Sequence, residues 1–248
     1  MKLIINAEDL GLSKSINKGI CEGLKEGFIT SASLFMNAKH TDEAVSLIKQ
    51  NDFKNVGIHL NLTYGKPLCD PKEVPHLVEN DGSFHYMCSM PFYAIYDEVK
   101  KELKKQIEKF LSFGLTPSHL DYHHYFYSSM EVMRAFLELA KEYDLPVRSM
   151  TEKTRKMAEE MGVRTTKMFL SDFHESYSGP TEEKLKQIVQ FLKDKNGSCE
   201  LMTLPGYVDE YTTTQTNYLG REQELLSLKK AFENGVFNDI ELVDFSKI

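Results

Sequence analysis

The sequence predicts an α/β fold, namely a single distorted (β/α) TIM-like barrel of seven or eight mostly parallel strands formed by residues 1–248. Three observations lead to this prediction. Short apolar, β-branched runs alternate with amphipathic helical patterns along the whole chain, no linker or change in composition divides it, and its length suits a barrel that closes as one domain. No glycine-rich phosphate-binding motif follows a strand, which disfavours an open nucleotide-binding sheet.

The first half of the chain is expected to give three strands and two helices. They are a strand over 2–7, a helix over 13–26 with Ser13 as N-cap and Gly27 as stop, a strand over 30–36, a helix over 41–49 and a strand over 55–62. Residues 63–93 are rich in proline and exceed the length of an ordinary connection. We expect a lid or substrate loop there.

The second half repeats the alternation with shorter strands. Its expected helices cover 96–113 (ended by Gly114), 131–143, 152–160, 181–193 (capped by Thr181) and 221–233. Its expected strands lie within 117–124 and over 146–149, 166–169, 199–203 and 240–245.

Composition and charge disfavour several classes of protein. The chain has 30 Lys+Arg against 37 Asp+Glu, a net charge of −7, which is a poor match for nucleic acid. No apolar run approaches the roughly 20 residues of a membrane helix, and the N-terminus becomes acidic too early for a signal peptide. The four cysteines form no CxxC pair, so we expect free thiols in a reducing cytoplasm.

Candidate metal ligands follow the strands, at the end of a barrel where active sites lie. Glu8 and Asp9 end the first strand; the alternative is that Asp9 only caps the next helix. His59 lies within an alternating run and, taken alone, is more typical of an ordinary core or surface histidine. Alternation also places His119, Asp121 and His123 on one strand face.

One carboxylate and two imidazoles from three strand ends would form a mixed oxygen and nitrogen site for Zn, Mn, Fe or, less comfortably, Mg. A bound divalent ion acidifies its water and polarises a carbonyl group. A second carboxylate beside the ligands can accept the proton of that water, which makes Glu8 a candidate general base.

Several motifs together resemble the YdjC-like carbohydrate deacetylases, the group that includes chitooligosaccharide deacetylase. The resemblance spans nearly the whole chain. Its motifs are NAEDLGLS at 6–13 with Asn17, Gly19 and Ile20, TSAS at 30–33, GIHLNLTxGKP at 57–67, PSHLDYHH at 117–124, ELM at 200–202, PGY at 205–207, and Tyr218 with Arg221, Glu222, Glu224 and Leu225.

The resemblance implies a distorted barrel whose metal ligands are Asp9, His59 and His123, with Glu8 as the base. It implies hydrolysis of the N-acetyl group of an amino sugar, such as a chitooligosaccharide or its phosphate, with release of acetate. Magnesium is the ion usually assigned to the family, although the ligand set would also suit zinc. A homodimer is consistent with the family and with the frequency of oligomers.

The chain departs from the family pattern at three places. Glu8 stands where an Asp is common, His123-His124-Tyr125-Phe126-Tyr127 replaces a longer histidine run, and Leu204 replaces a His before Pro-Gly. These departures leave open a catalytically weakened carbohydrate-binding protein as a second interpretation. A third is a different metal-dependent barrel hydrolase, such as a phosphoesterase, which would hold two ions.

Three further residues are candidates for binding the substrate: His124, Tyr125 and Arg148. Arg148 follows a short strand and would bind a carboxylate or a sugar phosphate; a structural ion pair is an equal alternative. The chain has no Trp, so an aromatic platform for a sugar ring would come from Tyr and Phe near 122–127, although such rings more often serve packing.

Overall fold

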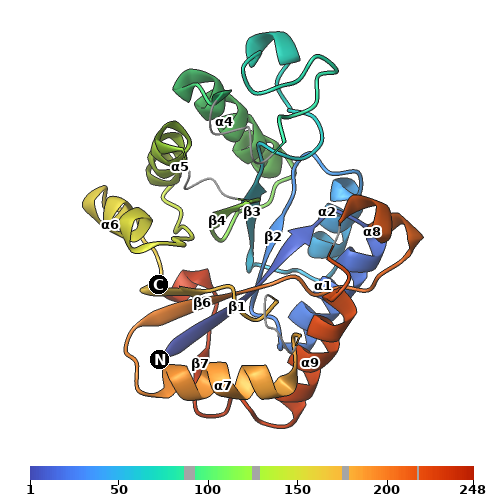
Figure 1. Cartoon of the computed structure of the whole chain (residues 1–248), viewed down its shortest axis with the longest axis vertical. Helices are drawn as coiled ribbons and strands as arrows, with labels where there is room; N and C mark the ends of the chain where they lie inside the picture. The colour runs from blue at the N-terminus through green and yellow to red at the C-terminus, as the bar shows by residue number, and fades with distance from the viewer. Residues whose placement is uncertain (87–92, 125–128, 175–178, 217) are drawn as a thin grey trace.

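Parallel strands form one curled sheet at the centre of the molecule (Figure 1). The computed structural model describes residues 1–86, 93–124, 129–174, 179–216 and 218–248. Within these, the strands are β1 (Lys2–Leu10), β2 (Ser31–Leu34), β3 (Val56–Leu60), β4 (Leu120–Tyr122), β5 (Met168–Leu170), β6 (Ser198–Thr203) and β7 (Glu241–Leu242). Their order is β4-β3-β2-β1-β6-β5, with β7 paired to the start of β1.

β4 and β5, the two end strands of this order, are connected only by isolated β-bridges among the described residues. Val147 pairs in parallel with Leu120 of β4 and with Thr165, and the chain then runs from Thr165 into β5. The predicted strand over 146–149 is therefore reduced to one bridging residue. The α/β fold with a distorted barrel of parallel strands is confirmed, in the form of a curled sheet that resembles a half-barrel.

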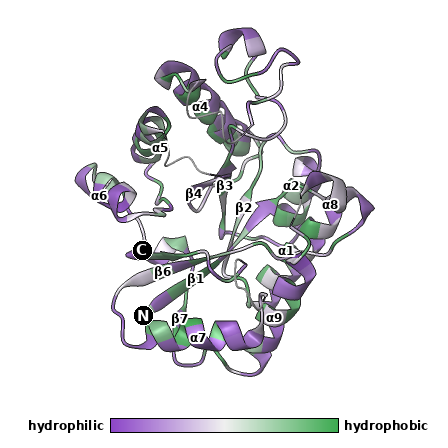
Figure 2. Ribbon diagram, in the orientation of Figure 1, coloured by the Kyte–Doolittle hydropathy of each residue, from purple (hydrophilic) through white to green (hydrophobic). Residues whose placement is uncertain are grey.

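Helices surround the outer side of this sheet (Figure 1). They are α1 (Lys14–Glu26), α2 (Thr41–Gln50), α4 (Tyr96–Ser112), α5 (Met130–Glu142), α6 (Glu152–Glu160), α7 (Glu182–Lys193), α8 (Glu210–Gln215) and α9 (Arg221–Glu233), with 3-10 turns η1 (Pro71–Glu73) and η3 (Phe245–Lys247). Figure 2 shows hydrophobic residues on the strands and on the inner sides of helices, and hydrophilic residues outside. No helix in the described ranges is both long and apolar enough to cross a bilayer.

Local signals explain where the helices begin and end. The Ser13 side chain accepts the N–H of Ile16 and Thr181 accepts that of Lys184, as N-caps do. Gly27 ends α1 at φ 88°, a left-handed conformation in which glycine carries no steric penalty. The short helix α8 was not predicted, because its threonine-rich sequence lacks helical periodicity; the Asp209 side chain caps it.

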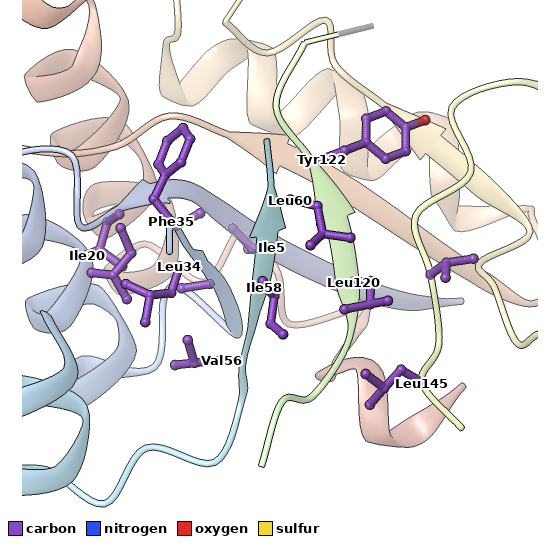
Figure 3. Packing of buried hydrophobic residues seen from close by; sticks show 14 of the residues in the cluster. Ile5, Ile20, Leu34, Phe35, Val56, Ile58, Leu60, Leu120, Tyr122 and Leu145 are labelled. Carbon is purple, nitrogen blue, oxygen red and sulfur yellow. The ribbon is translucent and has the colours of Figure 1, made fainter. Parts of the chain in front are cut away.

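The two faces of β1 differ in what they bury. Leu3, Ile5 and Ala7 pack in the main core under the helices, whereas Ile4 packs with Val243 and Phe245. Figure 3 shows part of the main core, where Ile58 of β3 lies beside Leu120 of β4, its partner in the sheet register.

The inner face changes from apolar to polar along the barrel. At the amino end of the strands, the ring of His119 stacks on Phe245 of η3, with centroids 3.8 Å apart. Farther along, Asn6 donates to Asp121 and to Glu200, both fully buried. The polar layer therefore lies above an apolar floor and leads to the carboxyl ends of the strands, where the candidate site was predicted.

Candidate metal and catalytic site

Three side chains from the ends of β1, β3 and β4 bring their ligand atoms together. Asp9 Oδ1 lies 3.5 Å from His59 Nε2 and 3.5 Å from His123 Nδ1, and the two imidazole nitrogens are 3.2 Å apart. These are the three residues that the family resemblance implies as metal ligands. One carboxylate and two imidazoles at this spacing form a plausible donor set for one divalent ion.

A bulge in β1 explains why two consecutive carboxylates face the same site. Adjacent residues of a regular strand point to opposite faces. The pairing of β1 with β2 shifts register between Ala7 and Leu10, and Asp9 takes the left-handed value φ 69°. A bulge re-aims side chains in this way, so both Glu8 and Asp9 reach the carboxyl end of the barrel. The alternative of Asp9 as helix cap is wrong, because Ser13 caps α1.

Asp9 is held through one carboxylate oxygen and leaves the other towards the histidines. Oδ2 accepts a hydrogen bond from Arg221 Nη2 at 2.5 Å. Oδ1 is buried and accepts no hydrogen bond from the residues that the structure describes. Burial opposes ionisation, but Arg221, His123 and His59 outweigh it and hold the pKa of Asp9 well below its usual range. Asp9 is therefore an ionised carboxylate with one unsatisfied buried oxygen, as a metal ligand would be.

His59 is oriented by a carboxylate behind it. Its Nδ1 lies 2.8 Å from Asp121 Oδ1 and 3.2 Å from Ser33 Oγ, which leaves Nε2 directed at Asp9 and His123. Burial lowers its pKa, but Asp121, Glu8 and Asp9 outweigh that effect and raise it. A carboxylate bonded to the far nitrogen of a ligating histidine is the usual support of a protein metal site.

His123 and its neighbour His124 lie at the mouth of the site. The side chain of His123 is 16% exposed, and burial lowers its pKa. His124 adopts φ 61°, and its Nδ1 lies 2.7 Å from Thr63 Oγ1. Burial and the nearby His123 lower the pKa of His124 to about 3, so it is neutral at physiological pH. Tyr125, the third predicted substrate contact, lies outside the described residues.

Glu8 is fixed by a buried arginine. Arg148 Nη1 donates to Glu8 Oε1, and Nε and Nη2 donate to Glu200 Oε1 at 2.9 and 2.5 Å. The other oxygen of Glu8 lies 4.0 Å from His59 Nε2, on the side of the ligands. Burial raises the pKa of Glu8 to about 7, even though Arg148 and His59 oppose it.

The assignment of Arg148 to substrate binding needs correction. Its side chain is only 1% exposed and its donors are occupied by Glu8 and Glu200, so it cannot meet a sugar. The structural ion pair, left open by the sequence, is what the structure contains. Tyr122 is likewise no sugar platform, because it is 1% exposed and packs edge-on against Phe136.

Some site residues had no role assigned from the sequence. Arg221 and Glu200 appeared only within motifs, and Asp121 only as one of three polar residues on a strand. A buried ion inside an apolar strand is costly unless it is paired, so Glu200 in SCELMT carried a usable signal. The contact of Arg221 with Asp9 spans 212 positions and has no local pattern that could reveal it.

Comparisons with known proteins identify the family. A model of the family described as YdjC-like protein matches residues 2–233. The chain is 37% identical over 254 residues to a carbohydrate deacetylase of Clostridium beijerinckii and 35% identical over 252 residues to one of Brevibacillus brevis, with 100% of each chain covered.

A solved structure agrees as well. A protein of Enterococcus faecalis V583 named for cellobiose-phosphate cleavage superposes with a TM-score of 0.90 at 28% identity, covering 99% of this chain and 98% of that one. Sequence and fold thus match over essentially the full length. The chain belongs to the YdjC-like family.

Proposed function

We propose that this protein is a metal-dependent carbohydrate deacetylase, which hydrolyses the N-acetyl group of an amino sugar and releases acetate. The observation that carries the proposal is the convergence of Asp9, His59 and His123 beside Glu8. Relatives named carbohydrate deacetylase, 30–37% identical over nearly the whole chain, support the reaction class.

The ion would be held by Asp9, His59 and His123. When bound, a divalent ion supplies an acidified water and polarises the acetyl oxygen. The buried, unsatisfied Oδ1 of Asp9 and the directed Nε2 of His59 fit such an ion. We propose magnesium from the family resemblance, with zinc as the competitor that the two imidazoles favour.

Glu8 is the proposed general base. Arg148 fixes one of its oxygens, and the other faces the ligands, where a water would be deprotonated. A pKa of about 7 lets the carboxyl group accept a proton and release it again near neutral pH. Leu204 offers no proton at the position where the family commonly has a His, and His124 is neutral. We therefore assign the return of the proton to the leaving amine to Glu8 as well.

The proposed substrates are N-acetylated amino sugars such as chitooligosaccharides or their phosphates. We place the protein in the cytoplasm, as a homodimer, on the composition and the family resemblance. The function is tested by incubating the metal-loaded protein with N-acetylglucosamine, its short oligomers and their phosphates, and measuring acetate. Acetate released by wild type and lost in Glu8→Gln supports the proposal. Absence of acetate with every ion and substrate contradicts it.

The second candidate is a metal-containing carbohydrate-binding protein with weakened catalysis, favoured by Leu204. Calorimetry would then show saturable sugar binding without acetate. A two-metal phosphoesterase is less well supported. The second group of candidate ligands, Glu8, His59 and Asp121, shares His59 with the first, and Asp121 is bonded to its Nδ1. The two groups therefore share one ligand, and metal stoichiometry separates the deacetylase from the phosphoesterase.

A further inference from the structure

The first turn of α9 reaches into the candidate site from the far end of the chain. Arg221, its first residue, is 1% exposed, and its Nη2 lies 2.5 Å from Asp9 Oδ2. Among the residues that the structure describes, no other Lys or Arg pairs with Asp9. Arg148, the other buried arginine of the site, pairs with Glu8, Glu200 and Asp121 instead.

The guanidinium group also contacts Leu204, the residue that follows β6. Arg221 Nη1 donates to the carbonyl oxygen of Leu204 at 3.4 Å, and Glu224 Oε2 accepts the Leu204 N–H at 2.6 Å. Tyr218 donates to the other oxygen of Glu224 at 2.6 Å. Both the N–H and the carbonyl oxygen of Leu204 are therefore bonded to side chains from the first turn of α9. These bonds tie the start of α9, and with it the backbone of Arg221, to the end of the sheet.

The contact with Arg221 bears on the orientation of the Asp9 carboxylate. Asp9 lies in a bulge with φ 69°, and its Oδ2 is the oxygen that meets Arg221. With Oδ2 bound to Arg221, Oδ1 lies 3.5 Å from each histidine nitrogen. Without Arg221, a buried carboxylate would be left without its cation beside the carboxylate of Glu8.

Two roles of this arginine have opposite consequences for metal binding. A cation that only neutralises charge would repel a metal ion, so its removal would tighten metal binding. A cation that orients Asp9 would preserve the ligand geometry, so its removal would weaken metal binding, as loss of an outer partner of a ligand commonly does. The short bond from Arg221 Nη2 to Asp9 Oδ2 and the single free oxygen of Asp9 favour the second role.

We propose that Arg221 is a positioning residue of the metal site, which orients Asp9 so that Oδ1 meets His59 and His123. The inference rests on the proposed metal-dependent function. The inference gives a role to the first turn of α9, which contains neither a proposed metal ligand nor the proposed general base.

The test measures metal affinity rather than activity. Metal-free wild type, Arg221→Met, Arg221→Lys and the control Arg134→Met are dialysed to equilibrium against Zn²⁺ and, separately, Mn²⁺, and bound metal is measured by elemental analysis. Arg134 lies on α5 with its side chain 64% exposed and pairs with Glu138. Melting curves of each metal-free protein are recorded in parallel.

We expect Arg221→Met to raise the dissociation constant by about tenfold to a hundredfold. The dissociation constant of Arg221→Lys should lie between those of Arg221→Met and wild type. The compact ammonium group of lysine cannot bond Asp9 and the carbonyl oxygen of Leu204 together, as the planar guanidinium group does. Arg134→Met should match wild type. A purely structural role would lower the melting temperature of the metal-free protein and leave the dissociation constant unchanged.

Unchanged or tighter metal binding by folded Arg221→Met overturns the positioning role and leaves the proposed function standing. If Arg221→Met does not fold, Arg221→Lys decides in the same way, because it keeps the buried charge. Failure of wild type to bind Zn²⁺, Mn²⁺ and also Mg²⁺ in the same dialysis overturns the proposed metal-dependent function, and the positioning role with it.

Discussion

The exchange Glu8→Gln should separate chemistry from metal binding. Glutamine keeps the shape of the side chain but cannot accept a proton from water. A general base typically contributes about a hundredfold to ten-thousandfold in rate, equivalent to roughly 3–5 kcal/mol of activation free energy. Glu8 lies outside the proposed ligand set of Asp9, His59 and His123, although it belongs with His59 and Asp121 to a second group that could hold a metal ion. On the proposed assignment, the variant should still bind one metal ion.

The fold should tolerate this exchange. The pKa of Glu8, raised by burial from 4.5 to about 7, means that its pocket already accepts a neutral side chain. Arg148 keeps its bonds to Glu200, and the change in unfolding free energy should stay below about 2 kcal/mol. The matched control is Glu233→Gln at the exposed end of α9.

Acetate release under saturating substrate gives kcat, and equilibrium dialysis gives the metal affinity of the same preparation. We expect kcat to fall by at least about a hundredfold with bound metal retained. If Glu8→Gln keeps more than about a tenth of wild-type kcat, Glu8 is not the base. If metal is lost along with activity, Glu8 is a ligand and the division of roles is wrong.

Three further predictions concern the supports of the site. Asp121→Asn should weaken metal binding by about tenfold to a hundredfold, because Asp121 orients His59; an unchanged affinity in equilibrium dialysis would exclude that role. Glu224 is buried, which raises its pKa from 4.5 to about 7, so above pH 4.5 the unfolded chain ionises while the folded one keeps the proton. Glu224 should therefore contribute up to about 3 kcal/mol to the stability that wild type loses as the pH rises from about 5 to about 8. Glu8 contributes in the same range, so urea unfolding of Glu224→Gln should show a smaller loss rather than none; equal slopes for the two proteins would refute the assignment. Gly57→Ala should destabilise the protein by about 1–3 kcal/mol, because the new Cβ would lie 2.4 Å from His119 Nδ1 and 2.5 Å from its carbonyl oxygen; an unchanged melting temperature would contradict this packing.

Long helices were predictable almost to the residue, and short strands were not. The helices 152–160 and 221–233 begin and end where expected. β4 has only three residues, and the segment around Val147 forms single bridges. Such segments hold their place through neighbouring strands, which no local pattern records.

The candidate ligands were within reach of sequence reasoning because they follow strands, where barrels place their sites. The partners of those ligands were harder to find. The bulge that places the Asp9 side chain on the same side as that of Glu8 depends on the register between β1 and β2. Arg221 comes from a part of the chain 212 positions away from Asp9. For Arg148, the sequence could not separate a substrate contact from an ion pair, since burial decides between them.

The central claim is that one metal ion, held by Asp9, His59 and His123, supports deacetylation. The most direct measurement titrates metal-free protein with a divalent ion and follows bound metal and acetate release from an N-acetylated amino sugar in the same sample. We predict that both rise together and saturate at one ion per chain. Acetate release that persists in excess chelator, or that requires a second ion, would contradict the claim.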